Sequence, residues 1–124
     1  MSLNNFLTDF VEGTDPMSSE AHRSRERIFQ GSVELHVGER SYLQPRARLV
    51  WIYSDIMQRN QGKASSAMQW LTDLADKHGV DLDLTADPQG GLSKNELRRW
   101  YKRHGFTFDR RYNGFRPNKK EVVA

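Results

Sequence analysis

The sequence predicts one domain of the α+β or α/β class, in which helices flank a central mixed β-sheet. The chain has 124 residues, enough for one hydrophobic core and little more. An apolar run at 49–53, a helical stripe at 64–78 and an alternating segment at 80–86 follow one another. Strand, helix and strand in this order favour a right-handed parallel crossover.

The N-terminal third combines a helix with strand signals. Apolar residues at 3, 6, 7, 10 and 11 have helical spacing. Residues 12–19 are typical of a loop, and Ser19 is then expected to cap a short polar helix that ends near Arg27. The segment 32–37 alternates apolar and polar residues, which predicts a half-buried strand.

A turn and the later elements complete the prediction. Gly38-Glu39-Arg40 indicates a hairpin turn into a second strand near 41–43. Gly79 is expected to end the helix at 64–78. Ser93 and Glu96 form a capping box that starts the next helix. A strand is expected to begin at 106–108 and to return through Asn113-Gly114 toward Phe115.

Composition excludes several classes of protein. Charged residues make up 28% and hydrophobic residues 36%, which is typical of a globular chain rather than a disordered one. No apolar run approaches the ~20 residues that cross a bilayer, and the N-terminus has no signal segment, so a cytoplasmic location and no membrane partner are expected. Without cysteine, thiolate chemistry is absent. The four histidines are not clustered, so no metal site is expected.

The segment Arg59-Asn60-Gln61-Gly62-Lys63-Ala64 lies between an apolar strand and a predicted helix. A loop of this kind gathers free backbone N–H groups at the positive end of a helix dipole. Small residues at 62 and 64 let a ligand approach the main chain closely. The segment therefore predicts a binding site for phosphate or pyrophosphate.

Two motifs carry a resemblance to a known family. The loop at 59–64 fits the pattern Arg/Gln-x-x-Gly-x-Gly/Ala, and Trp100-Tyr101-Lys102-Arg103-His104-Gly105-Phe106 fits aromatic-Tyr-x-x-x-Gly-Phe. In this order, with a strand and a helix between them, they resemble the GCN5-related N-acetyltransferase (GNAT) superfamily. The resemblance covers residues 46–116, whereas 1–29 form a poorly matching helical part of the same 1–124 domain. The compactness is similar to that of acetyltransferases encoded by bacteriophages.

The resemblance implies a splayed central strand, acetyl-CoA as co-substrate, and acetyl transfer to an amine by direct attack in a ternary complex. It places the pyrophosphate of coenzyme A on the loop Arg59, Asn60, Gln61, Gly62, Lys63 and Ala64. It assigns the pantetheine arm and the thioester carbonyl to the main chain of Ile52, Tyr53 and Ser54. Tyr101 takes the role of general acid, which protonates the departing thiolate.

The catalytic assignments have structural alternatives. Tyr101 shares a helical face with Leu97, and such stripes usually form the core. The amine needs a base, for which Glu34 and His36 are the best candidates and Asp55 the third. Each of these three is also consistent with an exposed strand or turn residue.

A second function class remains open. The basic and aromatic C-terminal part is consistent with a GNAT-fold protein that binds nucleic acid or a host protein without efficient catalysis; it contains Arg110, Arg111, Tyr112, Phe115, Arg116 and Lys119. The net charge is only +3, but the basic residues concentrate late in the chain, which makes a polyanionic partner plausible; composition alone favours a solvated cationic face. The acceptor amine, protein or small molecule, and the choice between monomer and homodimer are left open.

Overall fold

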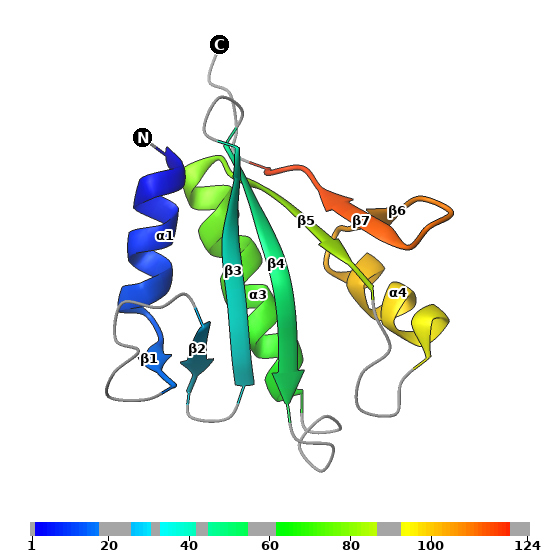
Figure 1. Ribbon diagram of the computed structural model, residues 1–124, viewed down its shortest axis with the longest axis horizontal. Helices are drawn as coiled ribbons and strands as arrows, with labels where there is room; N and C mark the ends of the chain where they lie inside the picture. Colours follow the sequence, from blue (N-terminus) through cyan, green and yellow to red (C-terminus); the bar gives the residue numbers. More distant parts are fainter. Residues whose placement is uncertain are drawn as a thin grey trace.

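The computed structural model describes residues 2–17, 26–30, 33–41, 45–54, 62–86 and 93–119 (Figure 1). Its elements, in chain order, are α1 (Ser2–Glu12), β1 (Asp15–Pro16), β2 (Glu26–Phe29), β3 (Val33–Ser41), β4 (Arg46–Ser54), α3 (Lys63–His78), β5 (Asp81–Thr85), α4 (Lys94–Arg103), β6 (Thr107–Phe108) and β7 (Asn113–Arg116).

The strands form one seven-stranded sheet in the order β1-β2-β3-β4-β5-β7-β6. β4 and β5 pair in parallel, and the other neighbours pair antiparallel. The parallel pair is the one that α3 connects, because a parallel connection needs a crossover. The predicted mixed sheet is confirmed.

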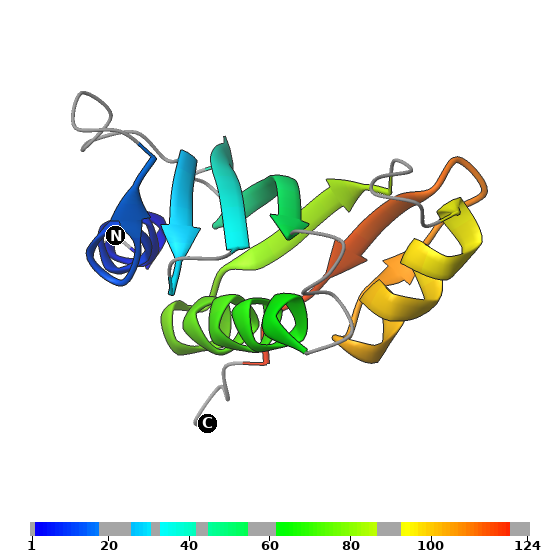
Figure 2. The same cartoon turned by 90° about the horizontal axis from the view of Figure 1, so that it is seen from below.

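Helices cover one face of the sheet (Figure 2). α3 buries the predicted stripe, including Met68 and Leu71, against strand residues such as Leu35. α1 packs beside α3 and adds Phe6 and Phe10 to the same core. Among the described residues, no helix lies over the opposite face, which carries alternate strand residues. We call this opposite side the open face.

Helix ends follow the predicted signals. Gly79 adopts the left-handed conformation after α3, with φ 68°. At the start of α4, the Ser93 hydroxyl accepts from the Glu96 N–H and the Glu96 carboxylate accepts from the Ser93 N–H. The capping box is therefore confirmed.

No helix in the described part of the chain is long and apolar enough to span a bilayer.

The predicted hairpin turn at 38–40 is wrong. β3 runs through Gly38 to Ser41 and pairs with β4, with Gly38 opposite Arg48. Gly38 instead lies between two register shifts, so it marks an irregular stretch of strand. The connection to β4 comes after Ser41, and the strand expected near 41–43 falls largely on residues outside those described.

The expected helix ending near Arg27 is also wrong at that end. Glu26–Phe29 is strand β2, which pairs with β3. Arg27 is only 4% exposed, and its guanidinium donates to the carbonyls of Val11 and Thr14 and to the Thr14 hydroxyl. Because the inward-facing Arg27 is charged, the sequence of β2 lacks the usual alternation of apolar and polar residues. Ser19 lies outside the described residues.

Candidate functional site

The two central strands separate after a short paired section. β4 and β5 are in register only from Arg46 to Arg48, opposite Asp81 to Asp83. β4 continues to Ser54, and Figure 1 shows the two strands diverging. Backbone N–H and C=O groups on that edge of β4 need partners that β5 does not supply. The splayed central strand predicted from the resemblance is confirmed.

A β-bulge lies just beyond the last paired residue. Trp51 is opposite His36 and Leu49 is opposite Val37, so Val50 has no counterpart on β3. Val50 is 43% exposed. Bulges re-aim neighbouring groups and are frequent beside active sites. The start of the splay is therefore an irregular part of the sheet.

The splayed strand leads to an open helix N-terminus. Gly62 precedes α3 in the left-handed conformation, with φ 75°, and no side chain of the described residues caps the helix. A Cβ added to Gly62 would meet no atom of the described residues within 4 Å. Lys63 is exposed and the first turn has no acidic residue. The geometry suits an anion. Of the predicted loop, Arg59, Asn60 and Gln61 lie outside the described residues.

α4 contacts this helix start through Trp100, the residue before the predicted acid. The Trp100 indole N–H donates to the Ser65 hydroxyl in the first turn of α3, at 3.0 Å. The adjacent Tyr101 is 7% exposed, and its ring packs against Phe106 and Phe108. Its burial fits the core alternative. Its role as a general acid stays a prediction.

The predicted base candidates lie on the open face. Glu34 is opposite Tyr53 and His36 is opposite Trp51, and both are half-buried. His36 Nδ1 is buried without a hydrogen-bond partner in the described part of the chain, 4.0 Å from a Glu26 carboxylate oxygen. The acid and base candidates therefore lie on opposite faces of the sheet. Asp55 is outside the described residues.

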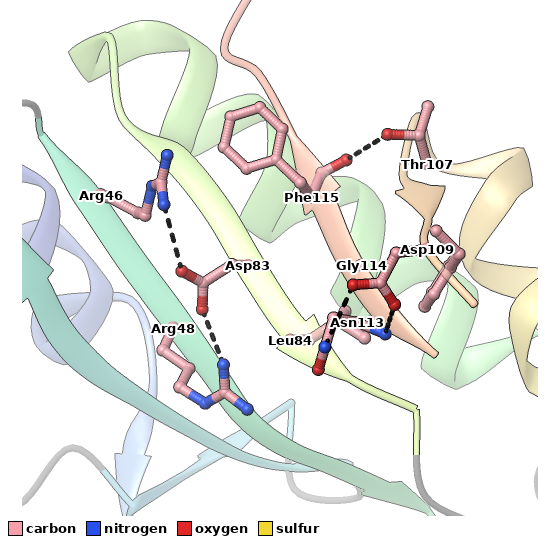
Figure 3. Close-up of a pocket in the computed structure, with 10 residues that line it drawn as sticks. Arg46, Arg48, Asp83, Leu84, Thr107, Asp109, Asn113, Gly114 and Phe115 are labelled. Carbon is pink, nitrogen blue, oxygen red and sulfur yellow. Dashed lines mark hydrogen bonds and ion pairs between the residues drawn. The ribbon is translucent and has the colours of Figure 1, made fainter. Parts of the chain in front are cut away.

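The open face also holds a pocket that the sequence did not reveal (Figure 3). Its volume is about 810 Å³, within the usual range for small-molecule sites. The lining residues come from β4, β5 and the β6–β7 hairpin and are Arg46, Arg48, Asp83, Leu84, Thr107, Phe108, Asp109, Asn113, Gly114 and Phe115.

Asp83 joins the strands at the floor of this pocket. Arg48 donates to Asp83 at 3.0 Å and to the Thr85 hydroxyl at 2.7 Å. Arg46 approaches the other carboxylate oxygen at 4.0 Å, and its guanidinium lies 4.8 Å from the centre of the Phe115 ring. Parallel pairing places Asp83 opposite Arg48, and Asp83 is only 8% exposed although it lies off the core face.

A second carboxylate lies on the hairpin side. Asp109 accepts from the N–H groups of Arg111 and Asn113 and from the Asn113 amide. Hydrogen bonds from Asn113, with a smaller contribution from Arg111, hold the pKa of Asp109 below its ordinary value. Asp109 is therefore anionic at neutral pH. Among the described residues, no three His, Asp or Glu side chains gather as a metal ion would require.

The basic C-terminal surface is smaller than the sequence indicated. Arg116 is 4% exposed, and it forms two hydrogen bonds to Asp76 and one to the His104 carbonyl. Its assignment to an interaction surface is therefore wrong. The Tyr112 hydroxyl donates to Asn95. Arg116 and Tyr112 both have structural partners.

Comparison with known proteins adds one similarity. The sequence matches no protein-family profile and no curated protein. The structure is similar to the crystal structure of Ard1 from Thermoplasma volcanium, with a TM-score of 0.52 and 17% sequence identity. The match covers 90% of this chain and 88% of that chain. At this identity the likeness concerns the fold, and the chain has a GNAT-like fold.

Proposed function

We propose that the protein is an N-acetyltransferase that transfers the acetyl group of acetyl-CoA to an amine. One observation carries the proposal: β4 leaves β5 after Arg48 and leads to the open N-terminus of α3. The edge of β4 beyond Arg48 has no paired strand among the described residues, and beside an anion-binding helix end it suits a ligand with a pyrophosphate and an amide-bearing arm. The similarity to Ard1, an N-terminal acetyltransferase, supports the same chemistry.

In this proposal, coenzyme A binds along β4 and α3. The pyrophosphate accepts hydrogen bonds from the main chain between Asn60 and Ala64, with Arg59 and Lys63 supplying charge. The pantetheine arm pairs with the free edge of β4 at Ile52, Tyr53 and Ser54. An extended arm in this position runs back from the helix start toward the bulge at Val50. The thioester therefore lies near the point where the strands separate.

The reaction needs an acid near the thioester sulfur and a base near the attacking nitrogen. The amine nitrogen attacks the thioester carbon, and main-chain N–H groups of β4 stabilise the resulting oxyanion. The C–S bond then breaks, and Tyr101 gives its proton to the thiolate. Glu34 or His36 takes the proton that the amine loses. Their placement on the open face suits an acceptor that approaches from the side opposite Tyr101.

Calorimetry with coenzyme A followed by a thiol-release assay tests the proposal. We expect stoichiometric binding of coenzyme A to the full chain, and release of free thiol from acetyl-CoA that depends on an added amine. The matched control is the same titration with a coenzyme A fragment that lacks the pyrophosphate, which binds weakly. Absence of coenzyme A binding by a folded preparation would refute the proposal.

A further inference from the structure

The pairing of the strands beneath the open-face pocket distinguishes one end of the pocket from the other. Arg46 lies two positions before Arg48, the last residue of β4 in register with β5. Thr85 ends β5 and is opposite Asn113, which binds Asp109. We call the end of the pocket at Arg46, where β4 and β5 are paired, the closed end, and the end at Asp109, where these strands have separated, the open end.

The closed end is cationic. Two guanidinium groups, of Arg46 and Arg48, meet one carboxylate, that of Asp83. Arg48 is held tightly by Asp83 and Thr85, whereas Arg46 reaches Asp83 only at 4.0 Å. The Arg46 side chain is 35% exposed and lies over the Phe115 ring. A fixed, accessible guanidinium of this kind suits a carboxylate, which it binds through two parallel hydrogen bonds.

The charged side chain that lines the open end is the carboxylate of Asp109, whereas the exposed Arg110 and Arg111 beside it are not lining residues. Asp109 stays ionised because Asn113 and Arg111 donate to its carboxylate. Those donors belong to the same turn, so they fix the carboxylate at the rim of the pocket. An ammonium group that approaches from solvent meets this charge before it reaches the splay. The two ends therefore attract groups of opposite charge.

We infer that the pocket binds the acceptor as a small molecule with a carboxylate at one end and an amine at the other. The carboxylate binds Arg46 at the closed end, and the amine lies near Asp109, beside the separating strands. The orientation of the molecule in the pocket rests on the proposed acetyltransferase function, because the amine end then faces the expected position of the thioester. The pocket of about 810 Å³ has ample room for such a molecule.

Direct binding to the full chain, without cofactor, tests the pocket by itself. 4-Aminobutyrate is compared by calorimetry with n-butylamine, which lacks the carboxylate, and with butyrate, which lacks the amine. We expect 4-aminobutyrate to bind about 10-fold more tightly than either, since each lost partner leaves a charged group unpaired. Equal affinities for the three probes, or equally tight binding of inorganic phosphate, would overturn the inference.

Substitution at Arg46 identifies the residue responsible. Arg46→Gln should remove the advantage of 4-aminobutyrate over n-butylamine, and Arg46→Lys should restore part of it, because charge returns without the planar pair of donors. Arg99→Gln, on the exposed side of α4, is the matched control and should behave as wild type. An Arg46→Gln protein that still prefers 4-aminobutyrate would refute the assignment.

Thiol release on the same preparations separates this inference from the proposed function. Arg46-dependent binding of 4-aminobutyrate with no binding of coenzyme A would remove the acetyltransferase and keep the pocket assignment. Coenzyme A binding with equally fast acetylation of n-butylamine and 4-aminobutyrate would keep the acetyltransferase and overturn the acceptor inference.

Discussion

Replacing Gly62 by Asp or by Asn tests whether an anion binds at the N-terminus of α3. Gly62 has φ 75°, a conformation that Asn and Asp tolerate better than other side chains. A Cβ there meets nothing within 4 Å in the described part of the chain, so neither side chain is expected to clash with those residues. The two variants have almost the same shape and differ by one negative charge. Their difference in coenzyme A affinity therefore measures electrostatic repulsion.

The size of that repulsion follows from Coulomb's law. At about 6 Å, one pair of unit charges contributes about 0.7 to 2.8 kcal/mol for effective dielectric constants of about 80 to 20. Gly62 is exposed, so the lower part of the range applies, and a pyrophosphate carries two charges. We expect Gly62→Asp to bind coenzyme A about 2 kcal/mol more weakly than Gly62→Asn, which is about 30-fold in Kd.

Calorimetry at low and high salt is the assay, with urea unfolding as its control. The gap between the variants should narrow in about 0.5 M salt, because screening weakens exposed charges. Asp at a helix start also stabilises the helix dipole, so Gly62→Asp should be as stable as Gly62→Asn or slightly more. Lower affinity with no lower stability excludes unfolding as the cause. Equal affinities at low salt would refute the anion site.

Three further outcomes are expected. Tyr101→Phe should lower turnover about 10²-fold with unchanged coenzyme A affinity. The control, Tyr112→Phe, should keep full thiol release. Full thiol release by Tyr101→Phe would remove the Tyr101 hydroxyl from the mechanism. Lys63→Gln should weaken coenzyme A binding more at low salt than at high salt, and equal losses would indicate a structural role. Asp76→Asn should destabilise the fold by about 3 kcal/mol in urea unfolding, because Arg116 stays buried without its anion. Burial raises the pKa of Asp76, but hydrogen bonds from Arg116 and the Lys119 N–H lower it by more, so it lies below its ordinary value. The difference in unfolding free energy between wild type and Asp76→Asn should therefore be complete above about pH 4, the ordinary pKa of Asp, and should shrink as the pH falls further. A difference that stays constant down to pH 2 would contradict this linkage.

Local signals predicted the elements whose side chains follow a simple period. The stripe on α3, the strand β5 and the Ser93–Glu96 box all appear in the structure, since each depends on residues close in sequence. The hairpin at Gly38 and the helix ending near Arg27 failed for a different reason. Glycine is common in turns but also fits an irregular strand, and Arg27 is buried because its guanidinium finds carbonyl groups 13 and 16 residues away.

The candidate site likewise has features that the sequence could indicate and features that it could not. The helix start at Gly62 and the placement of Tyr101 could be approached from motifs, because each lies within one continuous segment. The pocket could not, because Arg48 and Asp83 meet only when β4 and β5 adopt one parallel register. The alternation of core and non-core residues along β4 and β5 places Arg48 and Asp83 off the core face. This is the one signal in the sequence that could have indicated that they pair. Register itself depends on packing across the whole sheet.

The ion pair of Arg48 and Asp83 lies both where β4 and β5 separate and at the floor of the open-face pocket. Arg48 and Asp83 form the last pair in register between β4 and β5, so the free edge of β4 starts beside them. They also form the floor of the pocket on the open face (Figure 3). A shift of register between these strands would displace the gap and the cationic end of the pocket together. In the proposed function, the distance between thioester and acceptor is therefore set by sheet pairing, on rigid elements rather than on loops.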